Sequence, residues 1–369
     1  MYLAACIMVK DEKGQIERTI NSCKNNVDGF VFLDTGSSDG TPALIEKICS
    51  KNGIQYFLYH AQFVDFSTSR NYLSECAKKH AKYLLLLDAN DELYNGELLK
   101  KYIKDNSEFD VFIIRCILQN KQKQQVLPRY AIIKSEKDVQ FRYSVEEELV
   151  LDGHNVANLY ETGIYIYQDI QKDKSSVDRY ARDLELLYID YHKNPKDRHA
   201  LYNLAQTYRA LSKNLDSLKF FELYLQNKPS GSYETHKDDV FWCYIYVVEL
   251  LLMVQIDNWK NKILHHLNNC ISYVNGKRME PYYYYAMLYY FLGKELEHKQ
   301  DKICIKYYLK TRDYLQQASK IHKPTDTYAV YSEQLYVEIP KKIKEINELI
   351  QVYYFNKSRS SFGKQSLRF

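Results

Sequence analysis

Residues 84–93 read LLLLDANDEL, and residues 32–41 read FLDTGSSDGT. In each stretch an apolar run typical of a buried strand ends at an aspartate, Asp88 or Asp34, which small, polar or acidic residues follow. Short apolar runs of this kind alternate with helical patterns over residues 1–167, which is typical of βαβ units and a parallel sheet. Because open α/β sheets bind ligands at the carboxyl ends of their strands, both stretches predict a ligand-binding crevice there.

The same patterns place the elements of this N-terminal region. Two later apolar runs are expected to form antiparallel strands, and the others belong to the parallel part. Strands are expected at residues 2–9, 29–33, 55–59, 83–87, 111–118 and 129–134, and helices at 16–23, 41–52 and 67–80. The fold class predicted for residues 1–167 is therefore α/β.

Composition narrows the class of protein. The chain has 369 residues, with 51 Lys and Arg against 47 Asp and Glu, so its formal net charge is +4. This balance is too even for a nucleic-acid-binding protein, whose binding domain is usually clearly basic, so no nucleic-acid partner is expected. Hydrophobic residues make up 46% of the chain, which excludes disorder as the dominant state.

The cysteines and the apolar segments indicate the cellular compartment of the protein. Eight dispersed cysteines without a C-x-x-C pair predict reduced thiols in a cytosol-like compartment and no cysteine-based zinc site. The first residues, MYLAACIMVKDE, lack the basic start of a signal peptide and are interpreted as a strand. The most apolar later run, residues 245–254, is short and contains Glu249, so we expect a cytoplasmic protein with no membrane span.

After the predicted sheet the pattern is helical almost without interruption. Residues 199–229 follow the tetratricopeptide (TPR) template, a second match begins at Tyr285, and residues 239–274 fit two antiparallel helices. We therefore expect an all-α helical-repeat (TPR-like) domain over residues 168–350 and a loose, basic, Ser-rich tail over residues 351–369. The template positions of the first repeat are Leu204, Ala205, Tyr208, Ser217, Phe221 and Pro229.

The first strand-end loops carry side chains suited to a nucleotide. Asp34, at the tip of its strand, can accept hydrogen bonds from a nucleobase or a ribose, and Gly36 and the hydroxyl residues beside it leave room for that group. The loop VKDE, residues 9–12, would lie next to it at the same edge. An aspartate at this position can equally cap a turn, and the residues alone leave both interpretations open.

The acidic cluster after the next buried strand predicts a cation site. Asp88, Asn90 and Asp91 carry oxygen atoms, which Mg²⁺ and Mn²⁺ prefer as ligands together with substrate phosphates. The alternative is a solvated acidic loop. The buried strand before the cluster favours the cation site, because a strand end holds such side chains at a fixed geometry.

Four motifs occur in a fixed order, namely VKDE, LDTGSSDGT, the helix start FSTSRN and LLLLDANDEL. In this order they resemble family-2 glycosyltransferases of the nucleotide-diphospho-sugar transferase (GT-A) fold, over about residues 1–165. Together with the TPR-like region they resemble the subset of that family found in bacteria and large DNA viruses. The resemblance implies a GT-A domain followed by the helical-repeat domain.

The resemblance also implies roles for individual residues. Asp34 would hold the uracil or the ribose, and Arg70 would face the phosphates, since Arg suits oxyanion recognition. Asp88 and Asn90 align with the two outer positions of the Asp-x-Asp motif. In the family the second of these positions is normally an acid that contacts the metal. A neutral Asn binds a cation more weakly than a carboxylate does, and Asp91 would compensate for this weaker contact. The implied nucleotide-binding residues are Val9, Asp11, Glu12, Asp34, Gly36, Arg70, Asn71, Asp88 and Ala89, and the implied Mn²⁺ or Mg²⁺ ligands are Asn90, Asp88 and Asp91.

A further motif, RYSVEEE at residues 142–148, stands where the related subset often has Val-His-Glu. Glu147 matches the Glu of that pattern, and the His is missing. An inverting transferase needs a carboxylate near the acceptor hydroxyl as general base, so Glu147, or Glu146 beside it, is expected in that role. Adjacent acids repel, which raises the pKa of at least one. The alternative is a solvated acidic turn, and His154 is interpreted as structural, with a metal or phosphate contact as its alternative.

The activity implied is that of an inverting, metal-assisted glycosyltransferase of the hexosyltransferase type. Its donor would be a nucleotide-diphosphate sugar, with a UDP-sugar favoured, and its acceptor a hydroxyl of a protein or glycan. The helical repeats would bind the acceptor or a second subunit, and a second subunit would make the protein a homodimer. If the chain is viral, the protein is expected in the host cytoplasm or in the virion. The alternative is a non-catalytic helical-repeat scaffold with a degenerate nucleotide-binding domain. Asn90 and the missing His favour the scaffold, whereas LDTGSSDGT, SRN and Asp88 favour the enzyme.

Overall fold

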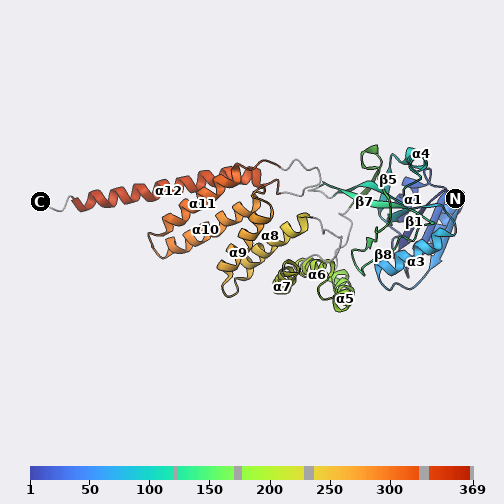
Figure 1. Ribbon diagram of the computed structural model, residues 1–369, viewed down its shortest axis with the longest axis horizontal. Helices are drawn as coiled ribbons and strands as arrows, with labels where there is room; N and C mark the ends of the chain where they lie inside the picture. The colour runs from blue at the N-terminus through green and yellow to red at the C-terminus, as the bar shows by residue number, and fades with distance from the viewer. Residues whose placement is uncertain (120–123, 170–176, 228–236, 324–331, 366–369) are drawn as a thin grey trace. The chain divides into compact units, whose positions relative to one another are not determined.

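The computed structural model describes residues 1–119, 124–169, 177–227, 237–323 and 332–365 (Figure 1). The chain divides into two compact units, Met1–Pro195 and Lys196–Phe369. Within the described residues, all strands belong to the first unit, and the second unit is built from helices. An α/β unit followed by an all-α unit is the architecture that the sequence predicts.

The first unit contains a nine-stranded mixed sheet and a small two-stranded sheet. The large sheet consists of β1 (Leu3–Val9), β2 (Gly29–Asp34), β3 (Tyr56–His60), β4 (Tyr83–Asp88), β5 (Asp91–Tyr94), β6 (Val111–Gln119), β7 (Gln124–Lys134), β10 (Val156–Asn158) and β11 (Tyr165–Asp169), and the small one of β8 (Phe141–Arg142) and β9 (Glu148–Leu149). The order in the large sheet is β3-β2-β1-β4-β7-β6-β11-β5, and β10 pairs with β6.

Strand register brings three strand ends together. β1, β2, β3 and β4 run parallel, and β1 lies between β2 and β4. Val9 of β1 pairs with Asp34 of β2, and Met8 pairs with Asp88 of β4. The loops that follow these strands therefore emerge at one edge of the sheet. β7 is antiparallel to both β4 and β6, as predicted for the later strands.

Helices cover both faces of the parallel strands (Figure 1). They are α1 (Ile16–Cys23), α2 (Thr41–Lys51) and α3 (Phe66–Lys78), which are followed in this unit by α4 (Leu99–Asp105), α5 (Val177–Lys193) and 3₁₀ turns at Gly96–Leu98 and Tyr160–Thr162. Successive β1 side chains point to opposite faces. Leu3, Ala5 and Ile7 pack in the core with α1 and α2, whereas Ala4 and Cys6 pack with α3, and all five are fully buried. This two-sided burial explains why the strand is a continuous apolar run.

The structure adds two features that the residue pattern does not predict. The first is β5, which follows β4 after a turn of only two residues, Ala89 and Asn90. Because β5 contains polar residues, a search for apolar runs does not detect this strand. The helical pattern after residue 176 predicts the start of the second domain, with a boundary after residue 167. In the structure α5 instead belongs to the first unit, since its side chains bond to that unit's loops, as described below.

The second unit consists of consecutive helices. They are α6 (Arg198–Ala210), α7 (Asn214–Gln226), α8 (Lys237–Val254), α9 (Trp259–Tyr273), α10 (Glu280–His298), α11 (Cys304–Ser319) and α12 (Leu335–Gln365). The first predicted repeat corresponds to α6 and α7, where Leu204 and Ala205 are fully buried and Ser217 Oγ donates to the Ala205 carbonyl at 2.9 Å. Pro229 lies outside the described residues. The pair predicted over residues 239–274 is confirmed as α8 and α9.

A glycine allows α10 and α11 to pack closely. A Cβ built on Gly293 of α10 would lie 2.7 Å from the ring of Tyr308 of α11, which is closer than side-chain carbons approach. Tyr308 is itself 2% exposed and donates a hydrogen bond to Glu297 Oε2 at 2.8 Å. The second TPR match, which the sequence places at Tyr285, therefore corresponds to a tightly packed pair of helices.

The C-terminal segment departs from its prediction as a loose tail. α12 continues through Gln365, and residues 366–369 lie outside the described ranges. Pro340 lies inside this helix, near its start, and between Pro340 and Gly363 the chain contains no further glycine or proline, so no other strong helix breaker interrupts this stretch.

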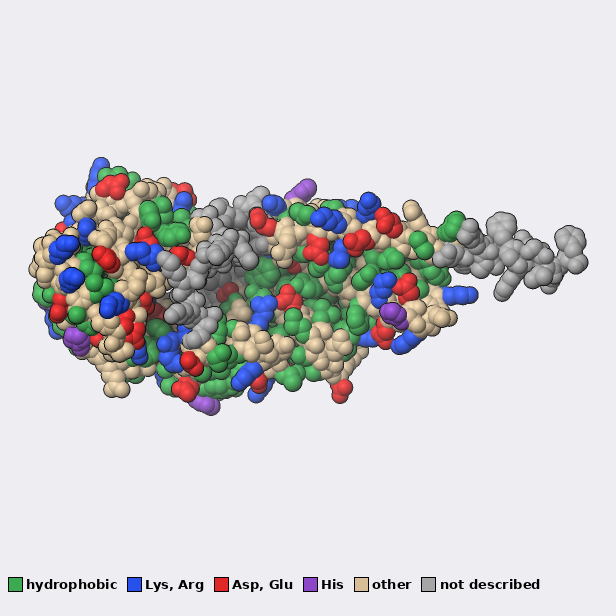
Figure 2. Space-filling view, turned by 180° about the vertical axis from the view of Figure 1, so that it is seen from behind, with side chains coloured by type: hydrophobic (Ala, Val, Ile, Leu, Met, Phe, Trp, Pro, Cys, Tyr) green, Lys and Arg blue, Asp and Glu red, His purple; other side chains and the backbone are tan. Residues whose placement is uncertain are grey.

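The surface of the second unit is partly apolar. Met253, Phe291 and Val337 are among its exposed large hydrophobic residues, and Figure 2 shows hydrophobic side chains between charged ones on one of its faces. None of the described helices combines the length and apolar character that crossing a bilayer requires. All eight cysteines are buried free thiols.

Candidate active site

The loops after β1 and β2 are fastened to each other. Asp11, at φ 57°, accepts hydrogen bonds on Oδ1 from the backbone N–H of Ser38 at 2.7 Å and of Asp39 at 3.1 Å. The backbone N–H of Glu12 donates to Thr41 Oγ1 at 2.8 Å. Asp11 and Glu12 thus hold the two loops side by side, so their first role in the structure is to shape the edge where a nucleotide would lie.

Asp34 caps its own loop. Its carboxylate accepts from the backbone N–H of Ser37 at 3.2 Å and of Gly36 at 3.4 Å, and it lies 3.3 Å from His60 Nδ1. Gly36 has a φ of 104°, which side chains rarely allow, and a Cβ there would meet nothing within 4 Å. Asp34 thus caps its turn in this structure, the space above Gly36 is open, and the nucleotide-binding role of Asp34 stays a prediction.

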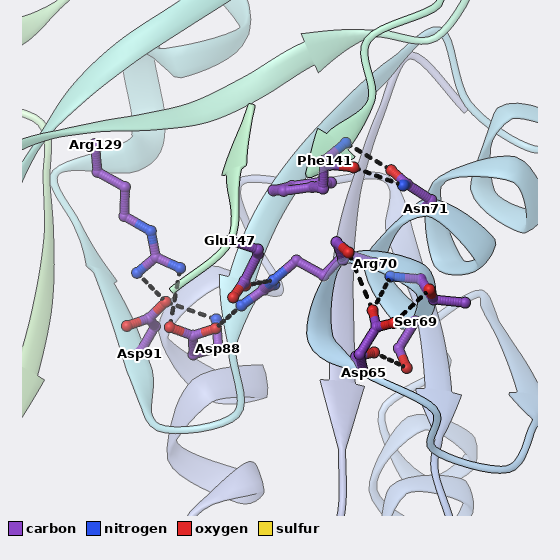
Figure 3. Close-up of polar contacts among 11 residues, drawn as sticks. Asp65, Ser69, Arg70, Asn71, Asp88, Asp91, Arg129, Phe141 and Glu147 are labelled. Atoms are coloured by element: carbon purple, nitrogen blue, oxygen red, sulfur yellow. Dashed lines mark hydrogen bonds and ion pairs between the residues drawn. The ribbon is translucent and has the colours of Figure 1, made fainter. Parts of the chain in front are cut away.

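Arg70 lies near the start of α3 and bridges two carboxylates (Figure 3). Its Nη2–H donates to Asp88 Oδ1 and its Nε–H donates to Glu147 Oε1. Asp65 caps the helix, since its side chain accepts from the Thr68 N–H at 2.6 Å, and so fixes the turn from which Arg70 extends. Three predicted site residues from separate elements thus meet at one guanidinium.

Asn71, which the resemblance places at the nucleotide, instead hydrogen-bonds to the backbone of β8 in the structure. Its Nδ2 donates to the Phe141 carbonyl at 2.9 Å and its Oδ1 accepts from the Phe141 N–H at 2.7 Å (Figure 3). The amide is thus fully engaged with the backbone of β8. Asn71 positions the strand that leads into the loop of Glu146 and Glu147, and the structure does not bring it to the acidic cluster.

Arg129 completes the cluster, although the sequence analysis did not select it. From β7 its Nη1 donates to Asp91 Oδ2 at 2.7 Å and its Nη2 to Asp88 Oδ2 at 3.1 Å (Figure 3). A signal was present, since Arg129 interrupts the otherwise mostly apolar stretch VLPRYAII. A charged residue in a central strand needs a partner of opposite charge, and Asp88 at the end of the adjacent strand β4 and Asp91 at the start of β5 provide it.

Burial and ion pairing set the protonation of the two aspartates. Burial opposes ionisation of Asp88, but the guanidinium groups of Arg129 and Arg70 outweigh it and hold the pKa of Asp88 well below its usual range. Burial raises the pKa of Asp91 to about 6; Arg129 opposes this shift and Asp88 adds to it. We interpret both carboxylates as ionised at neutral pH, because Arg129 contacts each at hydrogen-bond distance.

The two glutamates of the predicted base motif face differently. Glu147 is 13% exposed and points at Arg70, in the middle of the cluster (Figure 3). Glu146 is exposed at the surface, yet the protein atoms crowded around it raise its pKa, and the charges of Glu147 and Asp183 raise it further. The repulsion expected among adjacent acids is therefore present at Glu146.

His154 lies away from this site. Its Nδ1 is 3.7 Å from Asp110 Oδ2, just before β6. The pairing of Val111 with Ile133, and of Ile133 with Leu84, places this position level with the start of β4, at the edge opposite Asp88. The structural interpretation of His154 fits this position.

The three predicted cation ligands do not converge. Both carboxylate oxygens of Asp88 are bonded to guanidinium groups, and Asn90 Oδ1 accepts from Gln168 Nε2 of β11 at 3.0 Å. Asp91 is fully buried, so its second oxygen, which has no hydrogen-bond partner among the described residues, is closed to an approaching substrate. Within the described ranges no group of three His, Cys, Asp or Glu side chains is placed to hold a metal ion. The arrangement does not fit the expected Mn²⁺ or Mg²⁺ site.

The mixed sheet has helices on both faces of its parallel strands, and aspartates stand at the ends of β2 and β4. Residues 4–165 match the family model described as Glycosyl transferase family 2. The resemblance of the motifs to family-2 glycosyltransferases is therefore confirmed over these residues. The match ends before α5.

Two relatives of the chain are a TPR repeat-containing protein and a glycosyltransferase. A TPR repeat-containing protein of Synechococcus elongatus (strain ATCC 33912 / PCC 7942 / FACHB-805) is 33% identical over 109 residues, which are 29% of this chain and 24% of that protein. The SPbeta prophage-derived glycosyltransferase SunS of Bacillus subtilis (strain 168) is 21% identical over 265 residues, 70% of this chain and 60% of SunS. The chain thus spans about a quarter of the first protein and 60% of the second.

Solved structures resemble the chain at low identity. The S. aureus TarS structure in complex with UDP-GlcNAc is 15% identical, covers 75% of this chain and 93% of its own, and has a TM-score of 0.41. The mannosyltransferase PcManGT from Pyrobaculum calidifontis, in complex with GDP-Man and Mn²⁺, is 12% identical, covers 74% of this chain and 85% of its own, and has a TM-score of 0.40.

Proposed function

We propose that the chain is an inverting glycosyltransferase that moves a hexose from a nucleotide-diphosphate donor, in the first instance a UDP-sugar, to an acceptor hydroxyl. The observation that carries the proposal is Arg70, which joins Asp88 at the end of β4 to Glu147 in its loop (Figure 3). The residues that we assign to the phosphates, to the nucleotide and to proton abstraction therefore lie within one side chain's reach. The family 2 match of residues 4–165 supports the same activity.

The donor would lie along the carboxyl edge of β2, β1 and β4. The nucleoside would occupy the open space above Gly36, flanked by Val9 and the loop of Asp11 and Glu12. Asp34 and Asp88 are one strand apart on either side of β1, so base and ribose at the first would place the diphosphate towards the second. Arg70 is the cation that we assign to the diphosphate there.

The reaction would be a single displacement. The acceptor hydroxyl attacks the anomeric carbon of the sugar, and its proton passes to Glu147. The bond from that carbon to the phosphate oxygen breaks, and its electron pair leaves with the nucleoside diphosphate. Arg70 offsets the charge that develops on the leaving group, an effect that is largest in a site that excludes water. Attack opposite the leaving group inverts the configuration.

Glu147 is our choice of base because it points into the cluster, whereas Glu146 faces the surface. Glu147→Gln should lower kcat by about 10²- to 10⁴-fold while nucleotide affinity is kept, as expected for loss of general base catalysis. Glu146→Gln is the matched control on the neighbouring residue, and it should retain most of the activity. A larger loss in Glu146→Gln than in Glu147→Gln would transfer the role to Glu146.

The activity itself is tested with a panel of nucleotide sugars. Purified chain is incubated with each donor, release of nucleoside diphosphate is followed, and binding of UDP and GDP is measured by calorimetry. Turnover of one donor that Asp88→Asn abolishes would support the proposal. A chain that neither turns over a donor nor binds a nucleotide would contradict it and leave the helical-repeat scaffold.

The second unit would supply the partner contacts. Its exposed apolar side chains support binding of a protein or glycan acceptor, or of a second copy of the chain as a homodimer. Size-exclusion chromatography with light scattering distinguishes the homodimer from a monomer. A cytoplasmic location remains part of the proposal.

A further inference from the structure

The loop that carries Glu146 and Glu147 has a backbone that needs support. Tyr143 has a φ of 73° and Glu146 a φ of 51°, and neither is glycine. Such left-handed conformations are strained in residues that carry a side chain, and they persist only where surrounding contacts hold them. The position of Glu147 beside Arg70 therefore depends on what fixes this loop.

A single carboxylate on α5 provides the fixation. Asp190, which is 9% exposed, accepts from the Ser144 backbone N–H at 2.7 Å on one oxygen and from the Ser144 hydroxyl at 3.0 Å on the other. Ser144 is 3% exposed, so these bonds form away from water. Bonds to a buried charged acceptor are stronger than those between neutral groups.

The same anchor reaches the helix of Arg70. The carbonyl of Ser144 accepts from the backbone N–H of Phe66 at 3.1 Å, and Phe66 is the first residue of α3. On α5, the guanidinium of Arg182 lies 5.3 Å from the Phe66 ring centre, a cation–π contact. The loop of the candidate base and the helix of the phosphate-binding arginine are therefore tied to one helix.

We propose that Asp190 is a positioning residue of the transferase site, which orients Glu147 against Arg70 through Ser144. α5 is accordingly a part of the catalytic unit, although it lies beyond the 4–165 segment that defines the family domain. This inference rests on the proposed function, because it assigns the loop of Glu147 a role in catalysis.

The test compares the full chain with Asp190→Asn, Ser144→Ala and, as matched control, Glu185→Gln, an exposed carboxylate in the middle of the same helix. Asn keeps one acceptor but turns an N–H₂ group towards a donor, whereas Ser144→Ala removes only the hydroxyl bond. Donor turnover gives kcat and KM, calorimetry gives UDP affinity, and hydrogen exchange with mass spectrometry reports protection of residues 143–148. Hydrogen exchange can be measured without any transferase activity, so it reports on the loop even if the proposed function is wrong.

In Asp190→Asn we expect kcat to fall about 10- to 100-fold, as for a misplaced catalytic group, with UDP affinity within about threefold of the parent. The 143–148 segment should exchange faster, Ser144→Ala should show the same changes at smaller size, and Glu185→Gln should match the parent. Unchanged protection of the loop, or faster exchange with unchanged kcat, overturns the inference. If Asp190→Asn is unfolded by circular dichroism, Ser144→Ala decides by the same criteria. A parent chain without turnover or nucleotide binding contradicts the proposed function instead, and the exchange result still decides whether Asp190 holds the loop.

Discussion

At the scale of single residues, the acidic cluster depends on arginines from two different elements. Arg70 comes from α3 and Arg129 from β7, and each uses two N–H donors on carboxylates of the cluster. Asp91 is fully buried, so Arg129 is the charge that makes its ionised form tolerable. We therefore expect the stability of the cluster to be separable from its proposed role in binding a diphosphate, with Arg129 serving mainly the stability.

Arg129→Met should destabilise the folded protein by about 3 kcal/mol, since removing one partner of a buried ion pair leaves an uncompensated charge. The free energy of unfolding in urea measures the effect. The double variant Arg129→Met with Asp91→Asn should recover part of the loss, because the buried charge is then absent. A single variant as stable as the parent would mean that Asp91 is already neutral in the folded protein.

Metal removal should have little effect on nucleotide binding. Asp88 is bonded to two guanidinium groups, Asp91 is paired with one of them, that of Arg129, and Asn90 accepts from Gln168. We therefore expect UDP affinity in EDTA to lie within about threefold of that in Mn²⁺, less than 1 kcal/mol by the usual conversion. Calorimetry in the two buffers measures this. Affinity that collapses in EDTA would show that the cluster opens and rearranges around a cation.

At the scale of elements, a carboxylate before β2 secures the start of β1. Asp28 Oδ2 accepts from the backbone N–H of Tyr2 at 2.7 Å and of Leu3 at 3.0 Å, and Asp28 pairs with Lys100 of α4. Burial acts to raise the pKa of Asp28, but the Lys100 ammonium and the two N–H groups outweigh it and lower that pKa. Three elements of the first unit thus share one ionised side chain.

This shift has a defined pH dependence. Because the folded-state pKa of Asp28 lies below the unfolded value of about 3.9, its contribution to stability is present above that value and is lost as the pH falls through the folded pKa. Asp28→Asn should lower the free energy of unfolding at pH 7 by less than about 1 kcal/mol, since solvent screens this exposed pair, and the difference should shrink as the pH falls through the folded pKa. Urea unfolding of both proteins at pH 7 and over the acid range measures it. A difference that persists at low pH would mean that the carboxylate charge is not the cause.

Helix packing in the second unit has its own sensitive position. Gly293→Ala places a methyl group 2.7 Å from the Tyr308 ring and should push α10 and α11 apart. We expect a loss of about 1–3 kcal/mol, the usual cost of overpacking, visible as a lower melting temperature. Gly14→Ala is the matched control, because a Cβ there meets nothing within 4 Å. An unchanged melting temperature in Gly293→Ala would show that the ring of Tyr308 moves freely.

At the scale of the whole molecule, the sequence predicts the order of elements better than the directions of polar side chains. Apolar runs locate β1 to β4 and the aspartates that end them, because burial leaves a plain pattern. The sequence does not show that Asn71 hydrogen-bonds to Phe141 or that Asn90 hydrogen-bonds to Gln168, since those partners lie 70 and 78 residues away along the chain. Arg129 and Asp190 are missed for the same reason, because each acquires its role from contacts that only the folded chain provides.

The position of β7 between β4 and β6 also matters while the chain is being synthesised. β1 to β4 can pair once the first 88 residues have left the ribosome, but the other edge of β4 waits for its partner, in which Ile133 pairs with Leu84. Until then the nascent chain displays an unpaired strand of four consecutive leucines. Exposed apolar edges pair readily with other chains, so a ribosome that stalls before Lys134 releases an aggregation-prone product. Chaperone demand should therefore peak during translation of this interval.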